Sequence, residues 1–297
     1  MHPGQVEILP GTVTRLVAAQ FPEWQRQPVR RLTSSGTVNA LFRLGDEAVL
    51  RFPLRPSADR ERHDALVEEQ ATARRFAAHV SVEVPRPLGL GAPADGYPGW
   101  WSAYAWIPGE TASSEILDDA TTLARDLAAF VNAVHGLGTD GRVWDGYSRG
   151  GPLQTRHASV RQALAESVGM VDTRRLTRLW ERCLAASHDD RDVWLHADLM
   201  PGNLLLRQGR LAAVIDLEAV CIGDPAVDLM PAWNLLPPHG RDAYRRALGC
   251  NDAAWERGRG WALVQAIVAL PYYVRSNPVM ADTARRTLDA LLEDEPA

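Results

Sequence analysis

The segment from Val193 to Asp216 constrains this chain more than any other stretch of its sequence. It consists of short apolar runs that bracket a polar loop, and such runs predict short buried strands. The polar residues are His196, Asp198 and Asn203 in the loop, followed by Asp216 at the end of the next predicted strand. A loop with this set of side chains between buried strands is the first candidate for a functional site.

The order His196-Ala-Asp198-x-x-x-x-Asn203 has the spacing of a kinase catalytic loop. Phosphoryl transfer needs an oriented acceptor hydroxyl and neutralised phosphate charge more than it needs covalent chemistry. Asp198 would accept the hydroxyl proton or hold the hydroxyl in line. Asn203 and Asp216 would offer the hard oxygen ligands that Mg²⁺ prefers, and His196 would support the loop by hydrogen bonding.

Two simpler interpretations of this loop remain. Asp and Asn are common in turns and Pro-Gly marks turns, so each residue alone could belong to an ordinary hairpin. A transition-metal site at His196 and Asp198 is a second possibility, but no other histidine lies nearby in the sequence. The occurrence of all four polar residues in this register favours the kinase interpretation.

Composition sets outer limits on the function. The formal net charge is -5 and there is no run of basic residues, which argues against a nucleic-acid partner. No apolar run reaches transmembrane length, and the first residues lack the pattern of a signal peptide, so a cytoplasmic protein without a membrane partner is expected. Three scattered cysteines favour reduced thiols.

The first third of the sequence predicts an antiparallel sheet. Helical spacing covers 11–21, and a second, longer helix is expected over 57–80, with Glu69 on its apolar stripe. A buried carboxylate is costly unless it is paired, which makes Glu69 notable. The predicted strands occupy residues 28–33, 39–44, 48–52, 84–90 and 100–106.

The remainder of the sequence predicts mostly helices. They are expected at 119–137, 152–168, 172–187, 225–236, 239–249, 252–275 and 278–292. The change of composition near residue 107 predicts an α+β chain of two lobes, residues 1–106 and 107–297, with a cleft between them.

Further motifs outside the loop resemble a known family. They are Ser35-Gly36, Val49-Leu-Arg-Phe-Pro53, Val84-Pro-Arg-Pro87, Trp106-Ile-Pro-Gly-Glu110, Leu195-His-Ala-Asp-Leu-x-Pro-Gly-Asn203, Val214-Ile-Asp216 and Ile222-Gly-Asp-Pro-Ala-Val-Asp-Leu229. Over nearly its whole length the chain resembles the aminoglycoside phosphotransferase family of antibiotic and small-molecule kinases. The resemblance implies a bilobal protein-kinase-like fold, with an antiparallel-sheet N-lobe that carries one main helix and a mostly helical C-lobe.

The same resemblance implies roles for individual residues. Asp198 would be the catalytic base, Asn203 and Asp216 the Mg²⁺ ligands, and His196 and Asp228 structural supports. The nucleotide, ATP or GTP, would be bound by the phosphate loop and the strand that follows it, by the helix carboxylate and by the connection between the lobes: Ser34, Ser35, Gly36, Thr37, Arg51, Glu69, Ala105, Trp106 and Ile107.

Two positions depart from the family pattern. Arg51 stands where the family has a lysine that contacts the phosphates and pairs with a helix glutamate. The chain contains no lysine at all, so arginine must supply every such cation. Arginine keeps the charge and can still pair with Glu69, but it is bulkier. Ala197 stands where the family has glycine, so the dihedral angles of the loop could differ.

The sequence does not identify the acceptor. Polycationic aminoglycosides would need carboxylates, for which Glu218 and Asp224, and less directly Asp145 and Glu256, are candidates. Capping is the alternative role for Asp224 and Asp228. A second set, Trp233, Trp255, Trp261, Tyr272 and Tyr273, could line an apolar pocket or simply pack in the core.

The resemblance therefore implies a Mg²⁺-dependent O-phosphotransferase that acts on a hydroxyl of a small molecule, with an aminoglycoside or another antibiotic first among the acceptors. A metabolite kinase for a sugar or amino alcohol is one alternative. A catalytically inactive nucleotide-binding protein, suggested by Arg51, is the other. The sequence gives no indication of oligomeric state.

Overall fold

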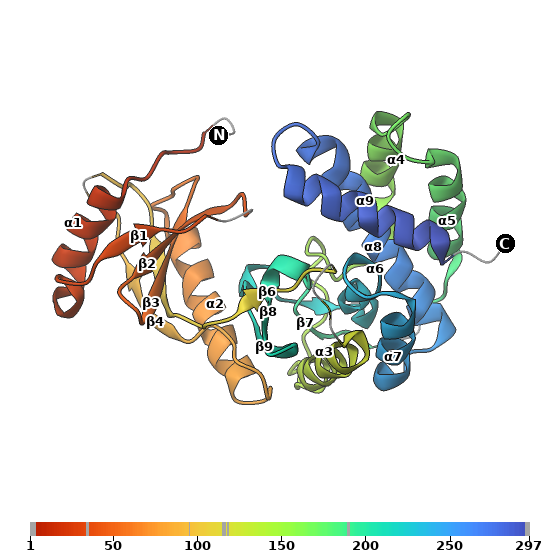
Figure 1. Ribbon diagram of the computed structural model, residues 1–297, viewed down its shortest axis with the longest axis horizontal. Coiled ribbons are helices and arrows are strands. Elements are labelled where there is room, and N and C mark those ends of the chain that lie inside the picture. The colour runs from red at the N-terminus through yellow and green to blue at the C-terminus, as the bar shows by residue number, and fades with distance from the viewer. Residues whose placement is uncertain are drawn as a thin grey trace. The chain divides into compact units, whose positions relative to one another are not determined.

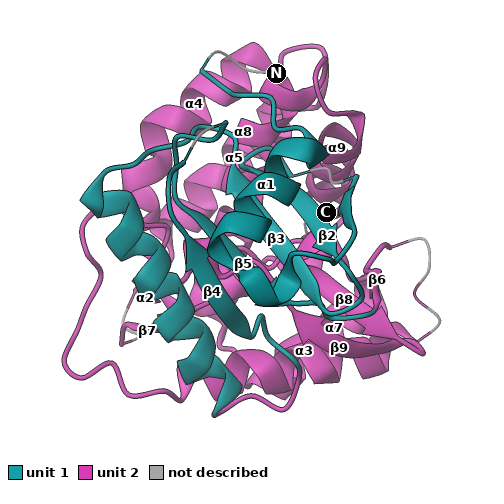
Figure 2. Cartoon of the chain, turned by 90° about the vertical axis from the view of Figure 1, so that its left-hand side faces the viewer, with its two compact units in different colours: residues 1–78, 83–108 teal, residues 79–82, 109–297 magenta. Residues whose placement is uncertain are grey.

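The computed structural model describes residues 4–33, 36–94, 96–114, 117, 119–188 and 191–294. The chain forms two compact units, shown in separate colours in Figure 2. Unit 1 comprises Met1–Ala78 and Glu83–Pro108, and unit 2 comprises His79–Val82 and Gly109–Ala297. Among the described residues, no helix combines the length and the apolar character needed to cross a membrane.

Unit 1 contains an antiparallel sheet of strand order β1-β2-β3-β5-β4, flanked by helices. Its elements are α1 (Pro10–Gln20), β1 (Val29–Arg31), β2 (Asn39–Leu44), β3 (Ala48–Pro53), α2 (Arg60–Ala77), β4 (Pro87–Gly91) and β5 (Trp101–Ala105). The alternating burial of β2 and β3 separates the sheet into two faces.

The two long helices of unit 1 cover opposite faces of this sheet. On one face, Phe42, Leu50 and Phe52 share a core cluster with Leu16 and Val17 of α1. On the other face, Arg51 of β3 pairs with Glu69 of α2, because neighbouring residues of a strand point to opposite sides. Figure 1 shows α1 and α2 on either side of the strands.

Unit 2 is mostly helical, with short strands that carry the loop of interest. Its elements are β6 (Glu110–Thr111), α3 (Ala120–His135), α4 (His157–Glu166), α5 (Thr173–Ala185), β7 (Val193–Leu195), β8 (Leu204–Arg207), β9 (Arg210–Val214), β10 (Cys221–Gly223), α6 (Pro231–Asn234), α7 (Pro238–Leu248), α8 (Asp252–Tyr273) and α9 (Pro278–Glu293). Strand β8 lies between β6 and β9, and β7 pairs with β10.

Helix α8 is the packing centre of the helical part, since it contacts α4, α5, α6 and α9. Glycines allow close approach on two of its sides. A Cβ at Gly258 would lie 2.7 Å from Leu229, and one at Gly260 would lie 2.6 Å from Leu153. The apolar helix is therefore buried on most of its circumference, which explains why its hydrophobic residues are not confined to one stripe.

The structure refines two predicted helices. The segment expected as a helix over 225–236 is a 3-10 helix at Pro225–Leu229 followed by the short α6. Pro231 lacks a backbone N–H and restricts the residue before it, so a continuous α-helix is interrupted there. The helix expected over 57–80 begins only at Arg60, because the side chain of Asp59 caps it by accepting from Arg62 N.

A backbone contact fixes the glycine-rich loop 145–151 beside β10. Asp224 N donates to Gly150 O at 2.9 Å, and the backbones of Gly150 and Gly223 touch. A Cβ at Gly150 would lie 2.8 Å from both Gly223 Cα and Ile222 O. Only residues without a side chain allow this approach.

We expect Gly223→Ala to destabilise the protein by about 1–3 kcal/mol, because the new methyl group would collide with the backbone of Gly150, which cannot rotate away. Urea-induced unfolding followed by circular dichroism measures this change. Gly138→Ala is the control, since its Cβ would meet only Asp140 Oδ1, at 3.8 Å. Equal midpoints for the two variants would contradict the packing argument.

Candidate active site

The polar loop begins where β7 ends and closes through a 3-10 turn, Pro201–Asn203, into β8. Leu195, Leu199 and Leu204 around it are fully buried, so the apolar residues anchor the loop on both sides. Ile215 N donates to Asn203 O at 2.9 Å. This backbone bond brings Asn203 next to the residue that precedes Asp216, although the two are far apart in sequence.

Asp198 is at the centre of the site and is 22% exposed. Its Oδ1 accepts hydrogen bonds from Arg149 Nη1 and, at 3.2 Å, from Gln265 Nε2. Asn203 Nδ2 donates to Asp198 Oδ2 at 3.0 Å and to the Asp198 backbone oxygen at 2.9 Å. The carboxylate is therefore held in one orientation by three different parts of unit 2.

Asp228 holds the backbone of the loop by hydrogen bonds. Its fully buried carboxylate accepts from His196 N at 3.0 Å and from Ala197 N at 2.8 Å. Oδ2 also contacts His135 Nε2 at 3.1 Å. Burial of a carboxylate is tolerated when donors surround it, and here they are the backbone N–H groups just before Asp198.

Backbone strain is concentrated at the same place. Ala197 has φ of 62° and Asp216 has φ of 66°, both in the left-handed region that favours glycine. At Ala197 the sequence departs from the glycine of the family pattern, and the chain adopts the glycine-like conformation despite the methyl group. The bond from Ala197 N to Asp228 helps to hold this conformation.

His196 is fully buried under the loop. Asp198 N donates to its Nδ1 at 3.3 Å, and Nε2 lies 3.1 Å from Ile215 O. Nδ1 must accept and Nε2 must donate, which assigns the neutral imidazole with its proton on Nε2. The ring thus links Asp198 to the strand end that carries Asp216.

Asn203 and Asp216 are the residues that could hold a magnesium ion. Because Asn203 Nδ2 is committed to Asp198, the remaining polar atom of that side chain is its oxygen. Together with the Asp216 carboxylate it offers hard oxygen ligands. A site of one carboxylate and one amide matches Mg²⁺, which keeps several waters and takes further oxygens from phosphate groups.

In unit 1, Arg51 and Glu69 form a buried ion pair, with Arg51 Nη1 2.6 Å from Glu69 Oε1. Tyr104 donates its hydroxyl to the same oxygen at 3.0 Å. Burial, reinforced by the neighbouring Glu69 charge, raises the pKa of Tyr104, so its hydroxyl stays protonated and keeps donating. Glu69 is therefore satisfied by two donors from neighbouring strands.

The structure describes most, but not all, of the residues that are expected to bind the nucleotide. Ser34 and Ser35 lie outside the described residues, and next to them Thr37 O accepts from Gln5 Nε2 at 3.0 Å. Two of the expected adenine-contact N–H groups are used inside unit 1: Ala105 N donates to Arg86 O at 2.8 Å, and Trp106 N donates to Glu47 O at 2.7 Å. Within the described part of unit 1, no backbone hydrogen bond from Ile107 N is found.

Asp224 does not lie at the surface. The expectation that it contacts an acceptor is wrong, because it is only 1% exposed and its carboxylate is engaged inside unit 2. Oδ2 lies 2.7 Å from Arg257 Nε, and Oδ1 accepts from Ala226 N at 3.0 Å. Asp224 thus caps the 3-10 helix that leads to Asp228 and pairs with a buried arginine.

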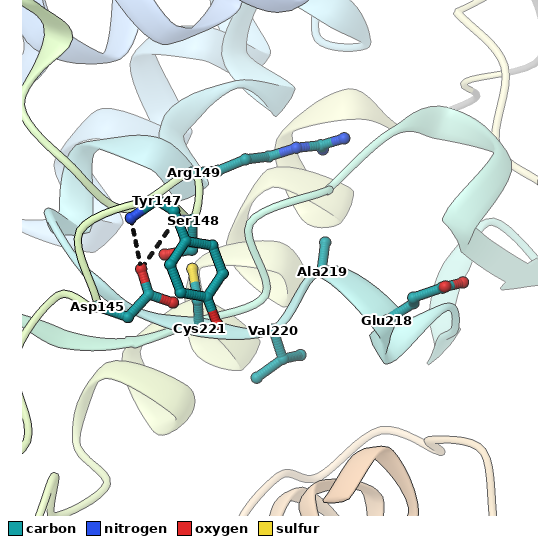
Figure 3. A pocket seen from close by; sticks show the side chains of 8 residues that line it. All are labelled: Asp145, Tyr147, Ser148, Arg149, Glu218, Ala219, Val220 and Cys221. Carbon is teal, nitrogen blue, oxygen red and sulfur yellow. Dashed lines mark hydrogen bonds between the residues drawn. The ribbon is translucent and has the colours of Figure 1, made fainter. Parts of the chain in front are cut away.

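The other residues that were considered as acceptor contacts lie in different places. Glu218 and Asp145 line a cavity of about 270 Å³ in unit 2, shown in Figure 3. Its remaining lining residues are Tyr147, Ser148, Arg149, Ala219, Val220 and Cys221. Glu256 instead interacts with Arg182 and Arg259. Trp233, Trp255 and Trp261 are buried core residues, whereas Tyr272 is exposed.

Sequence reasoning did not identify Arg149 and Gln265, which both bond to Asp198. Arg149 lies in a loop with glycines on either side, and a lone arginine in such a loop suggests only surface exposure. Gln265 is a polar residue within the apolar helix α8, and that mismatch is the one signal that could have drawn attention to it.

Comparison with known proteins identifies the family of this chain. The sequence profile described as "Phosphotransferase enzyme family" matches residues 29–261. The chain belongs to this family. It is a phosphotransferase, and the expected resemblance is confirmed. A comparison with curated proteins found no match.

Solved structures of aminoglycoside and macrolide phosphotransferases share this fold. The GDP and kanamycin complex of APH(2")-IIIa has a TM-score of 0.73 at 18% identity, covering 96% of this chain and 99% of that one. The macrolide 2'-phosphotransferase MphH from Brachybacterium faecium has a TM-score of 0.58 at 23% identity, covering 91% and 93%. These likenesses confirm the expected α+β protein-kinase-like fold of the phosphotransferase.

We expect Asp228→Asn to destabilise the phosphotransferase by about 1.5–3 kcal/mol, because an amide NH₂ would replace one of the oxygens that accept from the loop N–H groups. Equilibrium urea unfolding measures the loss. Asp282→Asn makes the same chemical change on the exposed surface of α9 and should leave the midpoint almost unchanged. Similar shifts for both would mean that Asp228 does not hold the loop.

Proposed function

We propose that this phosphotransferase transfers the γ-phosphoryl group of ATP or GTP to a hydroxyl group of a small molecule, with Asp198 as the catalytic base. The observation that carries the proposal is the orientation of Asp198. Arg149, Gln265 and Asn203 fix its carboxylate, and Asp228 fixes the backbone that leads to it. A base held this rigidly can orient an acceptor hydroxyl and take its proton during transfer.

Asn203 and Asp216 would hold the magnesium ion. When bound, Mg²⁺ would neutralise the charge of the phosphate oxygens during transfer. The bond from Ile215 N to Asn203 O and the contact of His196 with Ile215 O would keep both ligand-bearing segments in register. His196 and Asp228 are then supporting residues without a direct chemical step.

Unit 1 would supply the nucleotide site and unit 2 the catalytic, metal and acceptor residues. The Arg51 guanidinium is bonded to Glu69, and as a permanent cation it would also attract the phosphate groups of the nucleotide. Ser34, Ser35, Gly36 and Thr37 would form the loop over the phosphates. At the end of β5, Ile107 would offer its N–H to the adenine or guanine edge, while Ala105 and Trp106 would contribute carbonyl groups.

The acceptor is proposed to be an antibiotic or a similar hydroxylated compound. Structures that share the fold include complexes with GDP and kanamycin, and with ATP and streptomycin, as well as macrolide 2'-phosphotransferases. Glu218 lines the same cavity as Arg149, the partner of Asp198, and would be an acidic residue that contacts the acceptor. A metabolite kinase for a sugar or amino alcohol is the second candidate, since a small cavity with mixed polar lining also suits such compounds.

The ion pair of Arg51 with Glu69 counts against a catalytically inactive protein. Arginine preserves the pairing that a lysine would make, and in the loop Asp198 and Asn203 remain joined by a hydrogen bond.

Asp198→Ala should lower Mg²⁺-dependent turnover of ATP or GTP by about 10²–10⁴-fold, because no other group would take the acceptor proton. The measurement is release of ADP or GDP, with water or an added antibiotic as acceptor. Asp282→Ala, on the exposed surface of α9, is the control and should turn over nucleotide like the wild type. Equal turnover by Asp198→Ala and the wild type would exclude the proposed role.

Arg51→Ala should raise the KM for nucleotide and lower kcat, because the phosphates lose a cation and Glu69 loses its ion-pair partner. Arg51→Lys should retain much of the activity if the residue acts as a cationic clamp. Melting temperatures separate a loss of fold from a loss of binding. Arg15→Ala on α1, the helix on the opposite face of the sheet, is the control. If neither change at position 51 affects kinetics, the phosphates are held elsewhere.

A further inference from the structure

Arg149 reaches the catalytic loop from a loop that is itself held firmly. Its Nη1 donates to Asp198 Oδ1 and, at 3.1 Å, to Ala197 O. The neighbouring Asp145 carboxylate accepts from Tyr147 N at 3.0 Å and from Ser148 N at 2.8 Å, and Arg156 Nη2 binds Ser148 O at 2.6 Å. The position of Arg149 is therefore set by the fold.

The hydrogen bonds of Asp198 leave one lone-pair position on its carboxylate for an acceptor while Arg149 stays bound. A carboxylate offers about four lone-pair positions, two on each oxygen. Arg149 and Gln265 occupy Oδ1, and Asn203 takes one position on Oδ2. The remaining position on Oδ2 suits an acceptor hydroxyl. An acceptor bonded there would have the Arg149 guanidinium as a close neighbour across the same carboxylate.

Arg149 is also the more exposed member of this pair, at 48% against 22% for Asp198, and it lines the cavity of Figure 3. Tyr147, 81% exposed, offers an aromatic face to the same cavity. The carboxylate that pairs with Arg149 is Asp198 itself, so the guanidinium cancels the attraction that the base alone would exert on an ammonium group. The Asp145 carboxylate accepts from N–H groups of its own loop. Figure 3 shows Glu218 apart from Asp145, on a different segment.

We infer that Arg149 determines acceptor specificity by charge: it favours an acceptor that presents uncharged or anionic oxygen atoms next to the reacting hydroxyl, and it disfavours an ammonium group there. This inference rests on the proposed function of Asp198. A guanidinium has only donors and a permanent positive charge, so it binds hydroxyl, carbonyl or carboxylate oxygen and repels a second cation in a partly desolvated pocket. The acceptor class is then an oxygen-rich, non-cationic compound, rather than a polycationic aminoglycoside.

A matched pair of probes tests the inference: kanamycin, and kanamycin with every amino group acetylated, which keeps the rings but loses the charges. Affinities are measured by calorimetry for the full-length protein in the presence of Mg²⁺ and ADP. The wild type should bind the acetylated probe at least as tightly as kanamycin. Arg149→Glu should shift the ratio of the two dissociation constants by at least 10-fold towards kanamycin, and Arg149→Gln should shift it by less in the same direction.

Arg161→Glu is the control, because it makes the same charge change at an exposed position on α4. It should leave the ratio as in the wild type, and melting temperatures establish that all variants are folded. A ratio that Arg149→Glu does not change more than Arg161→Glu overturns the inference, including the case in which neither probe binds any protein. The inference is also overturned if the wild type binds kanamycin at least 10-fold more tightly than the acetylated probe.

Nucleotide hydrolysis by the wild type and by Asp198→Ala distinguishes a failure of the specificity inference from a failure of the proposed function. If hydrolysis depends on Asp198 but the probe ratio does not depend on Arg149, the phosphotransfer role of Asp198 stands and the specificity role of Arg149 falls. If hydrolysis is independent of Asp198, the function proposed for the site falls with it.

Discussion

The buried carboxylate of Asp228 is the interaction on which the candidate site depends. It accepts from the backbone N–H groups of His196 and Ala197, immediately before Asp198. Ala197 is held there in a left-handed conformation that costs an alanine about 1–2 kcal/mol, so the surrounding bonds must stabilise it. A charge that would be unfavourable in an apolar interior thus becomes the anchor of a strained loop.

The same principle, a buried charge surrounded by donors, recurs elsewhere in the molecule. Asp224 pairs with Arg257 and caps the 3-10 helix that carries Asp228 into place. In unit 1, Glu69 is paired with Arg51 and Tyr104. In each case a carboxylate out of water joins segments that are distant in sequence. Removing one donor would leave a buried carboxylate with fewer partners, which is more costly than breaking a surface ion pair.

Asp198 differs from these carboxylates because it is partly exposed and its donors leave a position for another molecule. Gln265 comes from the buried helix α8, Asn203 from the loop itself, and Arg149 from a glycine-rich loop packed on β10. A base can be oriented by neutral amides alone. The presence of a guanidinium adds a charge beside the acceptor position, and this is the feature from which we infer its specificity.

The sequence by itself determined the family and most of the secondary structure, and it singled out the candidate loop around Asp198. Hydrophobic periodicity located the long helices and the meander, because burial of apolar faces is written locally in the spacing of residues. Even Glu69 could be recognised as a buried carboxylate from its place on an apolar stripe. The helix boundaries observed at Asp59 and Pro231 differ from the expected ones, because capping and proline geometry depend on single residues.

What only the tertiary structure decided are contacts between distant segments. Asp224 was expected to contact an acceptor, but the structure buries it against Arg257. Nothing in the sequence connects Arg149 with Asp198, and only the folded structure brings the two together. The type of a polar residue and its neighbours in sequence do not state which distant group will face it. The physical reason is that burial and pairing depend on the packing of the whole unit, whereas helix and strand patterns depend on residues a few positions apart.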